Sequence, residues 1–375
     1  MRVDLRELLI LSTIPGIGPA RLISLLSHFQ DTHLVLQASA KELIAVQGIE
    51  KKTALNIVNF FRDSGIEQSR RFVDDQLSRL NKVEARVVTF WDKEFPSLLK
   101  NIYDPPAFLF VRGTVKADDK YSVAVVGTRT ASEYGRHMAE KIGQGLAKLG
   151  ITVVSGLARG IDTIAHASSL KAGGRTLAVV GSGVDIVYPG ENRELAERIV
   201  RHGAIVSEYP MGAKPDAPNF PRRNRIISGI ALGTVVIETG VEGGAMITAS
   251  TAFDQNRELF AVPAQVDGKR RSGTNLLIRQ GKATLIETVE DIVETLSAQL
   301  KGFLKTDAGA QNTPFPPLTA FEQKLYDVMG ETPMHIDTLA ERAGSTTADA
   351  LVNLLSLEFK GVVKQNPGKV FVRIA

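Results

Sequence analysis

Six short and almost continuous apolar runs between residues 121 and 264 constrain the fold more than any other feature of the sequence. Stretches with a helical pattern separate them. Strands that read this way are buried on both faces, which is typical of a parallel sheet covered by helices on each side. We therefore expect an α/β core with a doubly wound, mostly parallel sheet. The runs are Tyr121–Gly127, Ile151–Gly156, Thr176–Gly181, Ala204–Glu208, Thr234–Thr239 and Glu258–Ala264.

Loops of small residues follow these runs. Glycine lets backbone N–H groups approach a ligand without a side chain in the way. Ligands of such sheets bind at the carboxyl ends of the strands, so these loops predict one site for a phosphate-bearing ligand. The loops read VGTRTASEYG, SGLARGID, GSGVDIVYPGEN, SEYPMGAKP and TGVEGGAMITA.

The glycines do not form a known nucleotide-binding motif. After Gly127 the chain continues with Thr128, Arg129 and Thr130, without the second glycine of the dinucleotide fingerprint. The Gly-Ser-Gly that begins at Gly181 lacks the third glycine, and no G-x-x-x-x-G-K-[ST] sequence occurs. Binding of NAD or of a nucleoside triphosphate in an ordinary P-loop is therefore disfavoured.

Catalytic, metal and cofactor sites find little support. There is no cysteine, which excludes disulfides and thiolate zinc sites and fits a reducing cytoplasm. The six histidines lack metal-ligand spacing. Asp162 and His166 are four residues apart and could pair, but a carboxylate at a helix start is more often a cap. We expect no catalytic residue, no metal and no cofactor.

The segment Asn219–Gly229, NFPRRNRIISG, concentrates fixed positive charge. Pro221 suits the first position of a helix, which places Arg223 over an apolar stripe. Phe220 next to arginines offers a ring for a base and guanidinium groups for phosphate, as in proteins that bind single strands. The expected outward side chains are Arg222, Asn224, Arg225 and Ser228, and the expected inward ones are Ile226, Ile227 and Ile230.

A structural alternative for this cluster is an ion-pair hub with Glu208, Glu238 or Glu242 at neighbouring strand ends. The net charge is only +4, so positive charge for nucleic acid has to be focused locally. No apolar run approaches the length of a membrane helix, and we expect no membrane partner.

Two smaller domains are expected around the core. Residues 1–82 read as short helices with Gly-x-Gly turns at 14–29 and 46–61, although Glu50 replaces the second glycine of the later turn. Residues 83–300 form the core and 301–317 a linker. Residues 318–375 read as three helices and a hairpin, a winged helix. Its third helix has no Arg or Lys, which favours a protein-contact or regulatory module over a DNA reader.

Together the motifs resemble the DprA/Smf family over about residues 84 to 290. The resemblance implies an extended Rossmann-like core that binds single-stranded DNA without hydrolysing it. It also implies protection of incoming strands, their delivery to RecA recombinase in natural transformation, and a homodimer formed through the core. The flanking domains match the SAM-like or helix-hairpin-helix-like and winged-helix modules of the family. The matching motifs are VVGTR, SGLARGID, GSGVDIVYPGEN, SEYPMGAKPDAPNFPRRNRIISG, GGAMITA and FAVPA.

The resemblance also implies a DNA-binding set. Two positions depart from the family pattern, Glu242 and Ala264, and the basic run Lys269–Arg271 is either a compensating patch or a solvated loop. A nucleotide-cleaving enzyme of a related fold is the alternative, but EGGAMIT lacks the residues such an enzyme needs. The implied DNA-binding residues are Thr128, Arg129, Gly156, Lys214, Phe220, Arg222, Asn224, Arg225 and Asn275.

Overall fold

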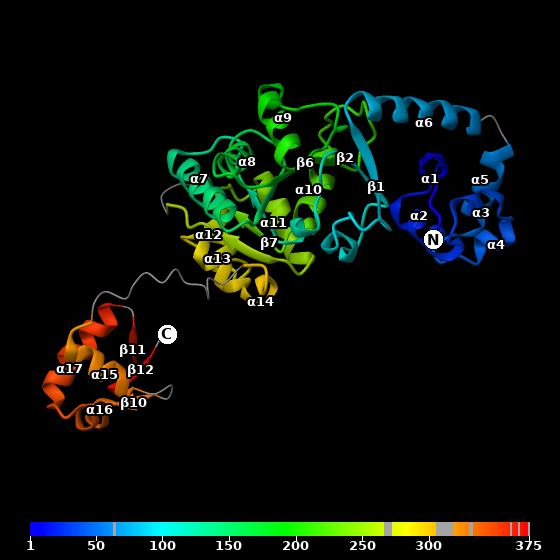
Figure 1. Ribbon diagram of the computed structural model, residues 1–375. Coiled ribbons are helices and arrows are strands. Elements are labelled where there is room, and N and C mark those ends of the chain that lie inside the picture. Colours follow the sequence, from blue (N-terminus) through cyan, green and yellow to red (C-terminus); the bar gives the residue numbers. More distant parts are fainter. Residues whose placement is uncertain are drawn as a thin grey trace. The chain divides into compact units, whose positions relative to one another are not determined.

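A nine-stranded sheet organises the larger part of the protein in the computed structural model (Figure 1). The strand order is β1-β2-β6-β5-β4-β3-β7-β8-β9. Pairing from β6 through β9 is parallel, whereas β2 is antiparallel to both β6 and β1. The strands are β1 Ala85–Thr89, β2 Phe108–Gly113, β3 Ser122–Val126, β4 Thr152–Ser155, β5 Thr176–Val179, β6 Ala204–Ser207, β7 Gly233–Val236, β8 Glu258–Ala261 and β9 Thr284–Leu285.

The chain divides into two units, and each is described by itself. Residues 1–304 form the first unit and 305–375 the second. The boundary that the sequence predicts at residue 82 falls at the end of α6, inside the first unit. The linker residues 305–317 and the basic run at 269–271 lie outside the described residues. The structure describes residues 1–62, 65–265, 272–304, 318–329, 333–360, 362–366 and 368–373.

The six apolar runs are confirmed as β3 to β8. Every residue of β3 to β7 is buried, as expected for strands covered on both faces. Alternate residues enter different clusters: Val125 packs with one group of helices and Val126 with the other. α7, α8, α9, α13 and α14 cover one face, and α10, α11 and α12 the other. These helices are α7 Glu133–Lys148, α8 Ile161–Lys171, α9 Arg193–His202, α10 Asn219–Ile230, α11 Gly244–Asp254, α12 Gly273–Arg279, α13 Val289–Thr295 and α14 Ser297–Leu300.

The order of connection fixes where a ligand site can form. From β3 the chain proceeds through β4 and β5 to β6 on one side of the sheet. It then crosses to β7 on the other side of β3 and continues to β8 and β9. The strand order therefore reverses around β3, and the crevice at the carboxyl end of β3 is the expected site of a ligand.

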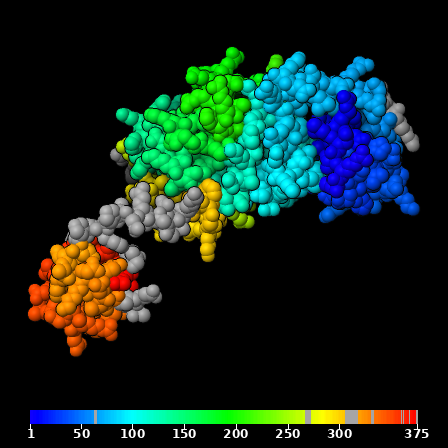
Figure 2. Space-filling model, in the orientation of Figure 1, coloured from blue at the N-terminus to red at the C-terminus, as the bar shows by residue number. Residues whose placement is uncertain are grey.

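The N-terminal helices pack against this core. Their own apolar cluster, which includes Leu8, Leu25 and Ile57, also contains Ala107 just before β2. In Figure 2 the blue helical region and the cyan region that follows it form one continuous surface. The helices are α1 Leu5–Ser12, α2 Pro19–Phe29, α3 Thr32–Gln37, α4 Ala40–Ile44, α5 Lys51–Arg62 and α6 Gly65–Lys82.

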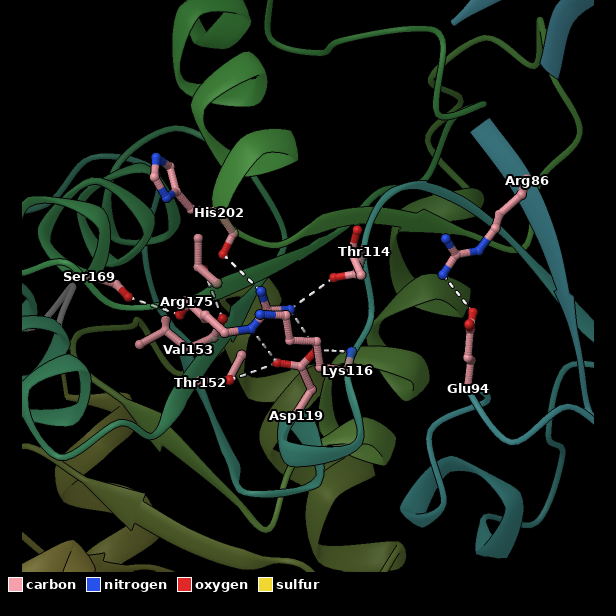
Figure 3. A network of polar contacts seen from close by, with 11 residues as sticks. Arg86, Glu94, Thr114, Lys116, Asp119, Thr152, Val153, Ser169, Arg175 and His202 are labelled. Atoms are coloured by element: carbon pink, nitrogen blue, oxygen red, sulfur yellow. Dashed lines mark hydrogen bonds and ion pairs between the residues drawn. The ribbon is translucent and has the colours of Figure 1, made fainter. Parts of the chain in front are cut away.

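A buried ion pair joins the amino ends of the central strands (Figure 3). Arg175, just before β5, donates from Nε and Nη2 to both carboxylate oxygens of Asp119, at 3.0 and 2.9 Å. Asp119 is 3% exposed and also accepts from Thr152 Oγ1 and from the backbone N–H of Lys116. Arg175 donates further to the carbonyl of Thr114. This network holds together the segments at the amino ends of the strands, opposite the crevice.

The second unit is a winged helix, as predicted. It contains α15 Ala320–Val328, α16 Ile336–Ala343, α17 Thr347–Phe359, and the strands β10 Met334–His335, β11 Val363–Asn366 and β12 Val370–Arg373. The strands pair in the order β10-β12-β11. On α17, Val352 is 67% exposed.

Across the described parts of both units, no helix has the length and apolarity needed to cross a membrane.

Candidate nucleic-acid interface

A cavity of 760 Å³ opens at the carboxyl ends of β3 to β7. The loops after these strands all contribute to it, so their predicted convergence on one edge is confirmed. Its lining carries few ionisable side chains, and Asp162 has the only carboxylate among the described residues that line it. The described lining residues are Val126, Gly127, Thr128, Arg129, Ala158, Asp162, Tyr188, Pro215, Ala217, Phe220, Pro221, Arg223, Asn224, Ile227, Thr239, Gly240, Gly243, Gly244, Ala245, Ile247 and Thr248.

Arg129 and Phe220 lie next to each other in the lining of this cavity. The guanidinium carbon of Arg129 lies 5.6 Å from the centre of the Phe220 ring. Arg129 is exposed and makes no ion pair within the described part of the chain. The loop after β3 therefore meets the start of α10 at this cavity. A cation over a half-buried ring can hold a phosphate beside a stacked base.

Tyr188 adds a second aromatic side chain that the sequence prediction missed. Its ring centre lies 6.0 Å from that of Phe220, at an interplanar angle of 41°. Tyr188 follows the glycine-rich segment after β5 and is 46% exposed. The signal available in the sequence was a large aromatic residue in a loop of small residues.

The helix that carries the arginines differs from the predicted one at two points. α10 begins at Asn219, so Pro221 is its third residue and not its first. Ser228, expected to face outward, is fully buried and donates to Gln255 at the end of α11. The inward placement of Ile226, Ile227 and Ile230 is confirmed. The outward prediction for Ser228 is wrong because α11 covers the flank of α10 that periodicity alone left to solvent.

Arg223 lies beneath the cavity, as its position over the apolar stripe predicted. It is 5% exposed, and its Nη1 donates to the carbonyls of Gly156, at 2.8 Å, and of Val179. Gly156 directly follows β4, and Val179 is the last residue of β5. Burial lowers the pKa of Arg223 to about 10, and the nearby carboxylate of Asp162 opposes that change. Arg223 thus ties α10 to the strand ends and supplies buried positive charge under the site.

Asp162 balances this buried charge from the first turn of α8. It accepts from the backbone N–H groups of Gly156 and Ala158, at 3.1 and 3.3 Å. Gly156 separates it from Arg223: a Cβ there would lie 2.8 Å from Nη2 of Arg223 and from Oδ2 of Asp162. Glycine is therefore required at position 156. The possible pair with His166 does not form, since His166 Nδ1 contacts Thr176 Oγ1 at 2.6 Å.

Asp162 gives the folded protein a defined pH dependence. Burial raises its pKa from 3.8 to about 6. The folded state then binds this proton more tightly than the unfolded chain does, so the stability from this group is present below about pH 4 and is lost as pH rises through 6. We expect the advantage of the wild type over Asp162→Asn in unfolding free energy to shrink between pH 4 and 7, by at most about 3 kcal/mol. Urea denaturation at several pH values measures it, and a constant difference would contradict it.

The remaining predicted residues lie in different places. Thr128 and Asn224 line the cavity, and Lys214 is exposed beside the lining residues Pro215 and Ala217. Asn275 lies outside the lining, where its side-chain amide accepts from the N–H and donates to the carbonyl of Ala264. It therefore fixes the chain just after β8.

Arg222 and Arg225 line a neighbouring cavity on another side of α10. Arg225 is paired with Glu208 and, at 3.1 Å, with Asp104. The ion-pair alternative is thus observed for this arginine. Glu242 is exposed and outside the first cavity's lining. No cluster of three or more potential metal ligands occurs within the described ranges.

Family models match three segments that together cover most of the chain. Residues 86–297 match the family described as DNA recombination-mediator protein A, residues 309–369 the DprA winged helix domain, and residues 8–63 a SAM-like helix-hairpin-helix tandem. Protein Smf of Escherichia coli K12 is 33% identical over 364 residues, 93% of each chain. The DNA processing protein DprA of Bacillus subtilis is 42% identical over 205 residues, which cover 54% of this chain and 69% of that protein.

Solved structures give the same assignment. The DNA processing protein A of Streptococcus pneumoniae is 30% identical with a TM-score of 0.65, covering 78% of this chain and 98% of that one. The protein from Helicobacter pylori, whose structure concerns its single-stranded DNA binding mode, is 28% identical with a TM-score of 0.52, covering 57% and 97%. This chain therefore belongs to the DNA recombination-mediator protein A family, the DprA/Smf family.

Proposed function

We propose that this protein binds single-stranded DNA without catalysis, protects incoming strands and loads RecA recombinase onto them in natural transformation. The observation that carries the DNA-binding part is the exposed Arg129 over the Phe220 ring, with Tyr188 beside it and buried Arg223 below. Stacking on a ring needs an unpaired base, which a duplex does not offer. The single-stranded DNA binding of the Helicobacter pylori relative supports the same ligand.

The alternative, a nucleotide-cleaving enzyme, has less support in the site. Asp162 has the only carboxylate in the described part of the lining, and one of its oxygens already accepts from the backbone N–H groups of Gly156 and Ala158. Incubation with nucleoside monophosphates tests it. Released base that Glu242→Ala abolishes would replace the proposal by the enzyme.

The role of Arg129 can be measured by salt titration. The wild type is expected to prefer labelled oligothymidylate to duplex of equal length. Its log–log salt slope should correspond to about 0.7 per neutralised phosphate. Arg129→Ala should lower the affinity and reduce the slope by about 0.7, since one phosphate contact is removed.

Arg201→Ala is the matched control. Arg201 is an exposed arginine in the last turn of α9, directly before β6, and so lies at the amino edge of the sheet away from the cavity. It should leave affinity and slope unchanged. Equal binding of duplex, or equal slopes for Arg129→Ala and the wild type, would contradict the proposed site.

The RecA and dimer parts of the proposal rest on family membership. RecA loading predicts faster RecA filament assembly on oligothymidylate when this protein is added at limiting RecA. A homodimer predicts twice the chain mass in sedimentation equilibrium. If the protein binds single strands but leaves RecA filament assembly unchanged, the proposed ligand stands and the proposed mediator role is wrong.

A further inference from the structure

A second cavity, of 570 Å³, lies between the N-terminal helices and the core. Its walls come from α1, α2 and α6 on one side and from β2, the end of β6 and α10 on the other. All of these elements belong to the first unit of the chain. The described lining residues are Leu9, Ser12, Thr13, Ile17, Gly18, Pro19, Leu22, Phe72, Asp104, Ala107, Phe108, Phe110, Glu208, Tyr209, Pro210, Arg222 and Arg225.

Buried polar contacts fix the two sides of this cavity relative to each other. Gln76 of α6 is 1% exposed, donates to the carbonyl of Met211 at 3.2 Å and accepts from its N–H at 2.7 Å. Within the helical side, Thr13 and Ser69 share a hydrogen bond of 2.7 Å. A cavity held by buried hydrogen bonds across its seam is preformed, so a ligand does not have to order it.

The interior suits a flat apolar group. Leu9, Phe108 and Phe110 line it, and Phe72 stands 39% exposed. Apolar and aromatic walls with a few polar groups are the usual composition of a small-molecule or base-binding pocket. Stacking on aromatic rings is the way in which proteins hold unpaired bases without sequence preference.

The charges indicate which part of the cavity suits a base and which part suits a phosphate. Inside the cavity, Arg225 is already paired with Asp104 and Glu208, so a phosphate entering there would meet two carboxylates. Arg222, in contrast, is exposed and makes no ion pair among the described residues. The N-terminus of α2, at Gly18 and Pro19, also lines the cavity without a side-chain cap and carries positive partial charge. A phosphate is favoured at Arg222 and α2, and a base among the rings.

α10 connects the two cavities. Phe220 and Asn224 line the first, and Arg222 and Arg225 line the second. A helix is about 10–12 Å across, a width that a few nucleotides of a single strand span. We infer that the second cavity binds a further base of the strand held in the first one, so that the N-terminal helices take part in binding DNA. This inference rests on the proposed single-stranded DNA function.

Filling the cavity tests the inference. Ser12 is half-buried in its lining, and Ser12→Trp in the full-length protein places a large ring there. Oligothymidylates of about 4 and about 16 nucleotides span the usual range of site sizes. The short strand has too few nucleotides to fill the first cavity and also cross α10 into the second. Ser12→Trp should therefore bind it as the wild type does, and bind the long strand about 5- to 100-fold more weakly, the effect of one lost base stack. Ser27→Trp, on the exposed side of α2, should change neither.

A second variant guards against a folding defect, which circular dichroism would reveal. Phe72→Ala removes a half-exposed ring from the cavity, and Leu55→Ala removes a similarly exposed apolar side chain elsewhere in the helical region. Phe72→Ala should weaken only the long strand. Unchanged binding of both strands by both cavity variants, or equal weakening of both strands, overturns the inference, and the cavity is then left for a protein partner. Failure of the wild type to bind either strand would instead overturn the proposed function.

Discussion

Arg175→Met is expected to destabilise the first unit by about 3–5 kcal/mol. Arg175 neutralises Asp119 through two hydrogen bonds, and Asp119 is almost completely buried. Methionine keeps the apolar stem but leaves a buried carboxylate with neutral donors only. Breaking a buried pair in this way costs far more than the pair contributes relative to an apolar replacement. Urea denaturation followed by fluorescence of Trp91, the only tryptophan, together with circular dichroism, measures the loss.

Arg86→Met supplies the control for this experiment. Figure 3 shows both pairs: Arg86 and Glu94 are joined at 2.6 Å, but their side chains are 42% and 55% exposed. Breaking an exposed pair should cost at most about 1 kcal/mol. If both variants lose the same stability, burial of Asp119 does not govern the network, and the account of the amino edge of the sheet is wrong.

Most residues of the strands that the sequence predicted are buried, although β2 was missed despite its buried residues Leu109, Phe110 and Val111. β3 to β8 read as continuous apolar runs because helices cover both sides of the sheet. β1 is only partly buried along its first three residues, and both residues of β9 are exposed. Such strands carry no continuous apolar run, so hydrophobic pattern alone could not separate them from loops.

The candidate site was predictable as a place and less so as a set of contacts. Glycine-rich loops after parallel strands located it, because the topology brings their ends together. The pairing of Arg225 with Glu208 and Asp104 joins residues that are 17 and 121 positions apart. Helical periodicity could place Arg225 outward, but it could not show which carboxylates come to meet it. The DNA-binding set implied by the family resemblance grouped Arg222 and Arg225 with Phe220, whereas these arginines line the second cavity and Phe220 lines the first.

Phe220→Ala is expected to have the largest effect on DNA binding. The ring of Phe220 is the point where the first cavity's cations and its second aromatic residue converge, with Arg129 and Arg223 at 5.6 and 5.9 Å. Removing it should weaken oligothymidylate binding by about 1–3 kcal/mol, the usual effect of losing one base stack. The salt slope should stay unchanged because no phosphate contact is lost.

This separation of affinity from salt slope tests how the first cavity works. Phe220→Tyr should retain binding, since a ring remains, and Phe253→Ala, which removes an exposed ring at the end of α11, should have no effect. In the double variant of Phe220→Ala with Arg129→Ala, the loss of binding free energy should be smaller than the sum of the two single losses, because Arg129 is positioned over the ring. A fall in salt slope for Phe220→Ala would mean that the ring orients a phosphate-binding arginine rather than stacking on a base. Full additivity would mean that Arg129 and Phe220 bind separate parts of the strand.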